Sequence, residues 1–308
     1  MKKIPLEGTL VGAYRFLFTR IISIVGTVWL PFVVMAAIIG GLLYVSVPHA
    51  WLQGQCPQIH TPQQAIAMLM PLLRIYPGLL LTGLIIASMV MVGLMRHSLG
   101  LKKGTTFVYF SLGGPVWRML GAFVLVYIIL MVLLAVLVGI VLVFWFTAVP
   151  MMPKGYGLAA GIVLSVIAFC VYVYSSVRLT FFIPAVVVAE GTLGVGRSWQ
   201  LGGGNFWRIF VIYLLIFIPV GFIASIALQL TVFPALFSVI AKLPHGGGPA
   251  HIGEVMRAMM PVLPAIVIVS LLERLAILSL LAGAIGTAYN AVTTPAAETA
   301  PAEAPKGE

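Results

Sequence analysis

The chain has 308 residues, of which 62% are hydrophobic and only 8% are charged, and its mean hydropathy is +1.16. A soluble domain carries about a quarter charged residues, so this composition excludes an ordinary soluble enzyme and predicts an all-α integral membrane protein. The net charge of +10 could indicate nucleic-acid binding, but the basic residues lie beside the apolar runs, which favours lipid headgroups and no nucleic acid.

The N-terminal segment 1–20 is predicted to be a cytoplasmic amphipathic piece that precedes a membrane domain over 21–292. Glu7, Arg15 and Arg20 interrupt the region where a cleavable signal peptide would need its apolar core. We therefore expect the segment to remain part of the protein.

Six apolar runs are long enough to cross a bilayer, because one helical crossing takes about 20 predominantly apolar residues. Most lysines and arginines flank the ends of these runs that lie on the side of the N-terminus. This bias predicts that both termini are cytoplasmic, in a bacterial cytoplasmic (inner) membrane. The predicted spans are 21–47, 75–95, 119–146, 156–177, 209–241 and 264–292.

A short pattern recurs before the odd-numbered spans. Gly-Thr occurs at 8–9, 104–105 and 191–192, each time followed by aromatic residues and by an arginine that opens a span. The pattern favours three parallel two-helix repeats related about an axis along the membrane normal. The alternative is that glycine, aromatic residues and arginine are favoured at every such junction.

The segment GTLGVGRS (191–198) differs by one residue from a phosphate-binding loop, because Arg197 occupies the lysine position. The glycines at 202–204 would interrupt the helix that must follow such a loop, and the sequence contains no aspartate to hold Mg²⁺. We therefore predict no nucleotide, and a short amphipathic piece between glycine hinges. The preceding run 179–189 is either the tail of the fourth span or a segment lying in the interface.

This connector contains six candidates for contact with lipid headgroups. Tryptophan rings settle at the membrane interface, and arginine side chains can extend from there to phosphate. The candidates are Arg178, Glu190, Arg197, Asn205, Trp207 and Arg208.

The stretch VRLTFFIPAVVVAEGTLGVGRSWQLGGGNFWRIF (177–210) resembles the signature of a six-span bacterial membrane domain. That domain is fused to some glycerophosphoryl diester phosphodiesterases and also occurs as free-standing proteins. The similar pattern is Arg178 before a proline segment, then Glu190, Arg197-Ser198 and GNFWR at 204–208. The resemblance implies the fold and membrane location of about 20–292. It implies no enzyme, because the phosphodiesterase chemistry of the fused proteins belongs to a separate soluble barrel.

Glu273 and Arg274 lie inside the sixth span, where a charge costs about 2.5–3.5 kcal/mol on insertion scales. Such residues usually face a partner or a cavity. One interpretation is a proton, ion or headgroup site. The other is a structural lock to Gln229 or to a group of an outer loop.

No catalytic constellation is visible, since neither a serine triad nor a carboxylate pair can be assembled. The outer loops contain residue types that bind metals, but without ligand spacing, so we predict no metal and no cofactor. These residues are His49, Cys56, His60, His245, His251 and Glu254.

The sequence thus predicts a non-enzymatic multi-pass protein that is lipid-associated, either in membrane organisation or in phospholipid handling. Its expected partners are membrane lipids, a homo-oligomer or other membrane proteins. The alternative is a small-solute or ion transporter or channel that uses Glu273 and Arg274. The segment 293–308, rich in Ala, Pro and Glu, is predicted to be a disordered cytoplasmic tail.

Overall fold

The computed structural model describes residues 2–46, 62–153 apart from 103 and 106, 155–240 and 262–293. All the regular secondary structure of these residues is helical, and none of them lies in a β-strand, as the composition predicts. The six metal-binding candidates of the outer loops and the tail after residue 293 lie outside the described residues.

Among the described residues, six helices are long and apolar enough to cross a bilayer, which confirms the predicted number. The chain is therefore a multi-pass α-helical membrane protein. These helices are α2 (Ile21–Ser46), α4 (Pro62–Ser98), α5 (Gly114–Val143), α6 (Tyr156–Thr180), α9 (Phe206–Ile240) and α11 (Leu263–Thr293).

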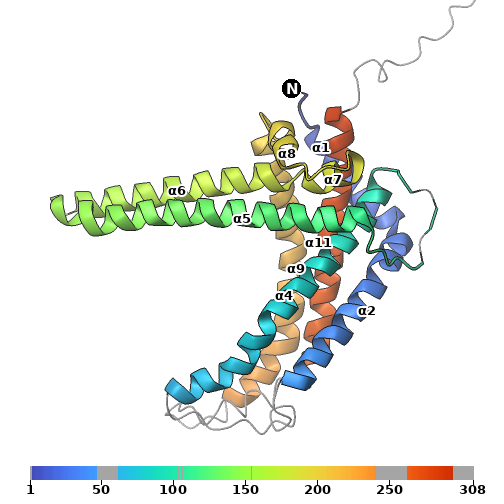
Figure 1. Cartoon of the computed structure of the whole chain (residues 1–308), viewed down its shortest axis with the longest axis horizontal. Coiled ribbons are helices and arrows are strands. Elements are labelled where there is room, and N and C mark those ends of the chain that lie inside the picture. The colour runs from blue at the N-terminus through green and yellow to red at the C-terminus, as the bar shows by residue number, and fades with distance from the viewer. Residues whose placement is uncertain are drawn as a thin grey trace, which may run out of the picture.

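Three short helices gather at one end of the molecule, which we call the connector end (Figure 1). Both ends of the described chain, residues 2 and 293, also lie there. The short helices are α1 (Leu6–Thr19), α7 (Ile183–Ala189) and α8 (Val195–Leu201). Helix α1 ends at Thr19 and α2 begins at Ile21, so the helical structure breaks at residue 20.

Prolines begin or interrupt several helices. Pro115 and Pro184 lie in the first turn of α5 and of α7, where a residue without an N–H group leaves no hydrogen bond unmade. Pro31 lies inside α2, and Pro219 and Pro234 lie inside α9, where each removes one helical hydrogen bond. The helices that surround the bundle interior are therefore not uniformly hydrogen-bonded.

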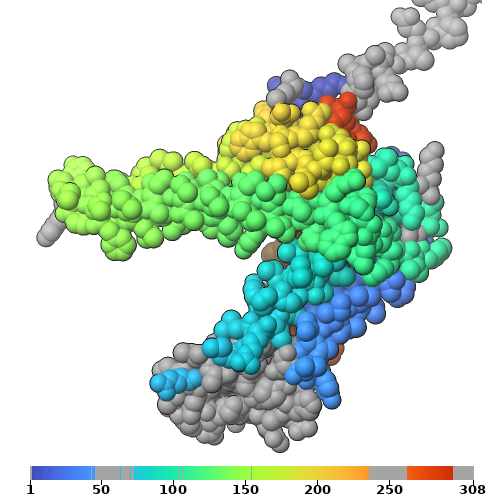
Figure 2. Space-filling view, in the orientation of Figure 1, coloured from blue at the N-terminus to red at the C-terminus, as the bar shows by residue number. Residues whose placement is uncertain are grey.

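Consecutive spans pair as three helical hairpins: α2 with α4, α5 with α6, and α9 with α11. The first and third hairpins run alongside one another, with α11 touching α2, α4 and α9. The second hairpin runs across them (Figure 1), so one axis does not relate all three units. The fully or nearly buried residues of α5 all lie between Val116 and Val126, and the rest of the hairpin stands clear of α4 (Figure 2).

Helix α1 packs closely along the connector end of α11. A Cβ atom on Gly283 would lie 2.9 Å from the Cα atom of Ala13, and one on Gly12 would lie 2.6 Å from Oγ1 of Thr287. Small residues allow two helix backbones to approach in this way. The Ser98 hydroxyl of α4 donates to the Ala282 carbonyl oxygen at 2.6 Å, so this half of α11 is held on two sides.

The run 179–189 lies in the core of the protein. Phe181, Phe182, Ala185 and Val186 have no exposed surface. The segment turns after α6 and continues as α7, which packs against α4, α5 and α11. The run is continuous with the fourth apolar stretch, which extends from Tyr156 to Ala189, and its depth in the membrane stays a prediction.

Candidate functional site

The Arg178 side chain contacts other residues of the protein, Tyr174 and Trp199. Its guanidinium lies 3.9 Å from the centre of the Trp199 ring and 5.3 Å from that of Tyr174. It donates hydrogen bonds to the Tyr174 hydroxyl at 2.6 Å and to the Trp199 carbonyl oxygen at 2.9 Å. A cation held over an aromatic face and hydrogen-bonded in this way joins α6 to α8.

The segment that resembles a phosphate-binding loop lacks the strand that such a loop requires. Residues 185–189 belong to helix α7, and α8 is only seven residues long. The hydroxyl of Ser198, which occupies the Ser/Thr position of the motif, is buried and donates to the Leu179 carbonyl oxygen at 2.8 Å. Gly194, with φ of +69°, forms the turn that begins α8.

Asn205 and Arg208 hold the N-terminal segment. The Ile4 N–H donates to Oδ1 of Asn205 at 3.1 Å, and Nδ2 of Asn205 donates to the Lys2 carbonyl oxygen at 3.2 Å. Arg208 donates to the Ile4 carbonyl oxygen at 2.5 Å. Asn205 is only 2% exposed, so its predicted contact with headgroups is wrong: its side chain is enclosed by the chain's own backbone.

Glu190 joins the connector to α11. Nε of Arg197 lies 3.3 Å from Oε1 of Glu190, and the Tyr289 hydroxyl donates to the same oxygen at 2.9 Å. The Arg118 guanidinium lies beside Gly191, 3.1 Å from where a Cβ atom would be. Because the Arg197–Glu190 pair is half-exposed, it contributes at most about 1 kcal/mol to stability.

Of the six connector candidates, Trp207 is the most accessible, with 72% of its surface exposed. The others make contacts inside the protein, and together they fasten α6, α8, α9, α11 and the N-terminal segment to one another. The connector is therefore built mainly as a structural junction of the helices.

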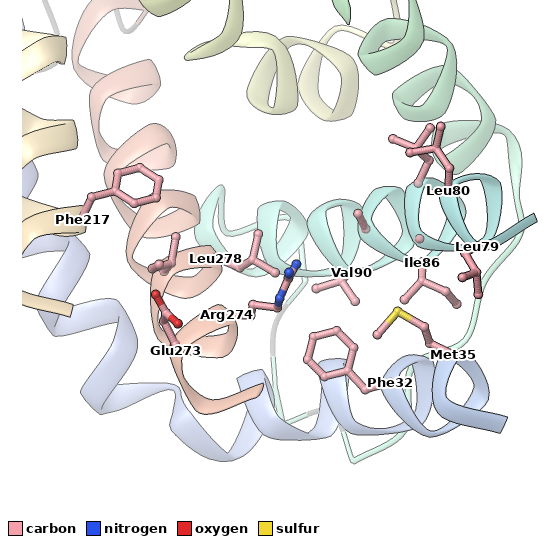
Figure 3. Close-up of a pocket in the computed structure, with 14 residues that line it drawn as sticks. Phe32, Met35, Leu79, Leu80, Ile86, Val90, Phe217, Glu273, Arg274 and Leu278 are labelled. Atoms are coloured by element: carbon pink, nitrogen blue, oxygen red, sulfur yellow. The ribbon is translucent and has the colours of Figure 1, made fainter. Parts of the chain in front are cut away.

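A cavity of about 590 Å³ lies between α2, α4, α9 and α11 (Figure 3). Its wall is apolar except for Glu273 and Arg274, which leave α11 in different directions. Both charged residues lie about ten residues, or about 15 Å, along α11 from Leu263. The labelled apolar residues are Phe32, Met35, Leu79, Leu80, Ile86, Val90, Phe217 and Leu278.

Neither Glu273 nor Arg274 makes a hydrogen bond or an ion pair with any described residue. Gln229 is exposed on α9, twelve residues or about 18 Å along the helix from the cavity residue Phe217. The predicted structural lock to Gln229 is therefore wrong, since the two groups face different surroundings. Both charged residues line the cavity, and the outer-loop groups proposed as alternative partners lie outside the described residues.

The apolar residues of the cavity wall could not be identified from the sequence. Phe32, Val90 and Phe217 come from three helices far apart along the chain, and each lies in an apolar run without local distinction. Of the cavity residues, only Glu273 and Arg274 could be recognised in the sequence, because they are charges within an apolar run. Among the described residues, no group of three or more His, Cys, Asp or Glu side chains is placed to hold a metal ion.

Comparisons of the chain with protein-family models, with curated proteins and with solved structures find no match. The resemblance to the membrane domain of glycerophosphoryl diester phosphodiesterases therefore remains a hypothesis that rests on the residues of 177–210.

Proposed function

We propose that this protein is a non-enzymatic, lipid-handling protein that binds a phospholipid in the cavity between α2, α4, α9 and α11. The connector residues 178–208 then serve to hold the helices together around that cavity. The observation that carries the proposal is the pair Glu273 and Arg274, both without a partner among the described residues, in an otherwise apolar cavity.

The cavity matches an amphiphile in size and in chemistry. Ligand sites usually enclose about 300–1,000 Å³, so about 590 Å³ accommodates a headgroup and part of an acyl chain. Arg274 can donate to a phosphate, and Glu273 can accept from an ammonium group. A phospholipid that carries both groups, such as phosphatidylethanolamine, would satisfy both charges and fill the apolar remainder.

The experiment is native mass spectrometry of the gently solubilised full chain, titrated with phosphatidylethanolamine. We expect the wild type to retain one phospholipid and Arg274→Met to weaken its binding about tenfold or more, because a hydrogen bond to a charged group is worth about 1.5–3 kcal/mol. Glu273→Gln should weaken binding of phosphatidylethanolamine more than that of phosphatidylglycerol, which has no ammonium group.

Arg74→Met is the matched control, because Arg74 is exposed near the other end of α4 from the connector and does not line the cavity. Retention that is the same in Arg274→Met as in Arg74→Met would contradict the proposal. Loss of all lipid in every variant, including the control, would instead indicate nonspecific association.

Transport of a small solute or an ion is the second candidate for the same cavity. Pro31 in α2, Pro77 in α4 and Pro219 in α9 interrupt three of the four helices around it, and such breaks are common in transporters. Proteoliposomes distinguish the two functions. A pH-driven flux that Glu273→Gln abolishes would favour transport, whereas a lipid-occupied protein without flux favours lipid handling.

We further propose that the connector end faces the cytoplasm of a bacterial cell, in its cytoplasmic membrane, and that the chain is related to the membrane domain named above. The concentration of basic residues around α1, α8 and the starts of α5 and α9 supports this orientation. A single cysteine at Trp207, in a background lacking both native cysteines, should be protected from an impermeant thiol reagent in intact cells. Labelling there would reverse the orientation.

A further inference from the structure

A second apolar surface lies outside the bundle, near the connector end of α2. It is a groove of about 320 Å³ lined by Ile21, Ile22, Val25, Gly26, Trp29 and Phe107. It shares none of these residues with the cavity of Glu273 and Arg274. Its side chains are apolar, and Arg20 directly precedes it in the chain.

The chain between α4 and α5 forms one wall of this groove, and it passes beside α2 (Figure 1). Nε1 of Trp29 donates to the Phe107 carbonyl oxygen at 2.7 Å, and the Tyr109 ring is buried next to Gly93 of α4. Phe107 itself is 70% exposed, and Phe110 also points outward. The loop is thus fixed to the protein while it presents apolar side chains to the surroundings.

The depth of this loop is limited by its backbone. Among the described residues from 104 to 112, which leave out 106, the backbone makes one hydrogen bond with another described residue: the Phe107 carbonyl oxygen accepts from Nε1 of Trp29. Unpaired peptide groups are excluded from the hydrocarbon region, so this loop must lie where water still penetrates. Tryptophan also prefers the membrane interface, so the loop and the connector end of the groove lie near the headgroups, and the groove runs from there along α2.

Three cations lie at the connector ends of α2 and α4: Arg20 precedes α2, Arg96 lies in the last turn of α4, and Lys102 follows α4. Arg20 and Lys102 lie close enough to His97 for both charges to act on its ring, and Arg96 acts in the same way on Tyr109. Lys102 also lies 5.8 Å from the centre of the Tyr109 ring. No carboxylate of the described residues pairs with Arg20, Arg96 or Lys102. A cluster of uncompensated positive charge at a membrane interface attracts anionic lipid.

We propose that this surface is a binding site for one anionic phospholipid, whose phosphate contacts Arg20 and Lys102 and whose acyl chain lies in the groove of Ile22, Val25, Trp29 and Phe107. The site does not depend on the cavity proposal, because it uses other residues and a different headgroup charge. It would fix the loop between α4 and α5 at the membrane surface.

The test measures lipids retained by the full chain in native mass spectrometry after reconstitution with equal amounts of phosphatidylglycerol and phosphatidylcholine. The wild type should prefer phosphatidylglycerol. Arg20→Gln or Lys102→Gln should each lower this preference about fivefold, and the double variant about thirtyfold, because each cation at the surface contributes a comparable attraction. Arg74→Gln, with the same charge change at the far end of α4, should leave the preference unchanged.

Val25→Trp tests the groove without changing any charge, since Val25 is 44% exposed and the larger ring fills the space for the acyl chain. It should lower retention of phosphatidylglycerol, whereas millimolar inorganic phosphate should not displace the lipid from the wild type. Displacement by phosphate would overturn the role of the groove. Equal retention of the two lipids by the wild type, or an unchanged preference in the double variant, would overturn the site.

Discussion

Asn205→Ala provides the clearest separation between a structural and a lipid-binding role of the connector. The substitution removes the acceptor of the Ile4 N–H and the donor to the Lys2 carbonyl oxygen, both at buried or partly buried positions. An unsatisfied buried donor costs about 1–3 kcal/mol. If the N-terminal segment instead detaches, the exposure of the Ile4 side chain costs about 1.5–3 kcal/mol.

The variant will either leave the Ile4 N–H unsatisfied or release the N-terminal segment, whichever has the lower free-energy cost. We therefore expect the free energy of unfolding to fall by about 1–3 kcal/mol. Reversible unfolding by titration with sodium dodecyl sulfate, followed by circular dichroism, measures this loss. Asn205→Asp should lose less, because it keeps the acceptor for the Ile4 N–H. The matched control is Gln200→Ala, since Gln200 is exposed on α8 and its side chain makes no hydrogen bond with the described residues.

The fall in the free energy of unfolding of Asn205→Ala should be the same in detergent without lipid as in the presence of anionic lipid. Limited proteolysis should also cleave the N-terminal segment of Asn205→Ala faster than that of the control. If Asn205→Ala matches Gln200→Ala in pure detergent and differs only after phosphatidylglycerol is added, the side chain contacts lipid and the reasoning from its burial is refuted.

Three further predictions concern packing and ionisation. Trp199→Leu removes the aromatic face from Arg178 and should lower the free energy of unfolding by about 0.5–2 kcal/mol. Trp207→Leu, which removes an exposed ring, should lower it less. Equal losses in the two variants would contradict the role of the cation–π contact. Gly283→Val forces a side chain against the α1 backbone and should cost about 1–3 kcal/mol, seen as a lower thermal midpoint; an unchanged midpoint would contradict this packing. Burial raises the pKa of Tyr109 above its ordinary value of 10.0. The stability that the neutral Tyr109 contributes is therefore present below pH 10.0 and is lost as the pH rises through the raised pKa. Tyr109→Phe should make the thermal midpoint fall less steeply over that alkaline range.

The hydrophobic length of each span is a local property of the chain, and for that reason the sequence determined it well. A bilayer requires about 20 consecutive apolar residues whatever lies elsewhere in the protein, so the six runs predicted the six long helices. The charged pair at 273–274 was found in the same way, because a charge inside an apolar run stands out without any knowledge of its neighbours.

Only the tertiary structure decided what the polar residues contact. Asn205 binds a backbone group 201 positions away, and Glu190 accepts from Tyr289, 99 positions away. The sequence of 178–208 contains the same Trp, Arg and Asn residues whether they face lipid or one another. The cavity and the groove likewise depend on helices and a loop that meet only after folding, because a space between elements is a property of their packing and of no single segment.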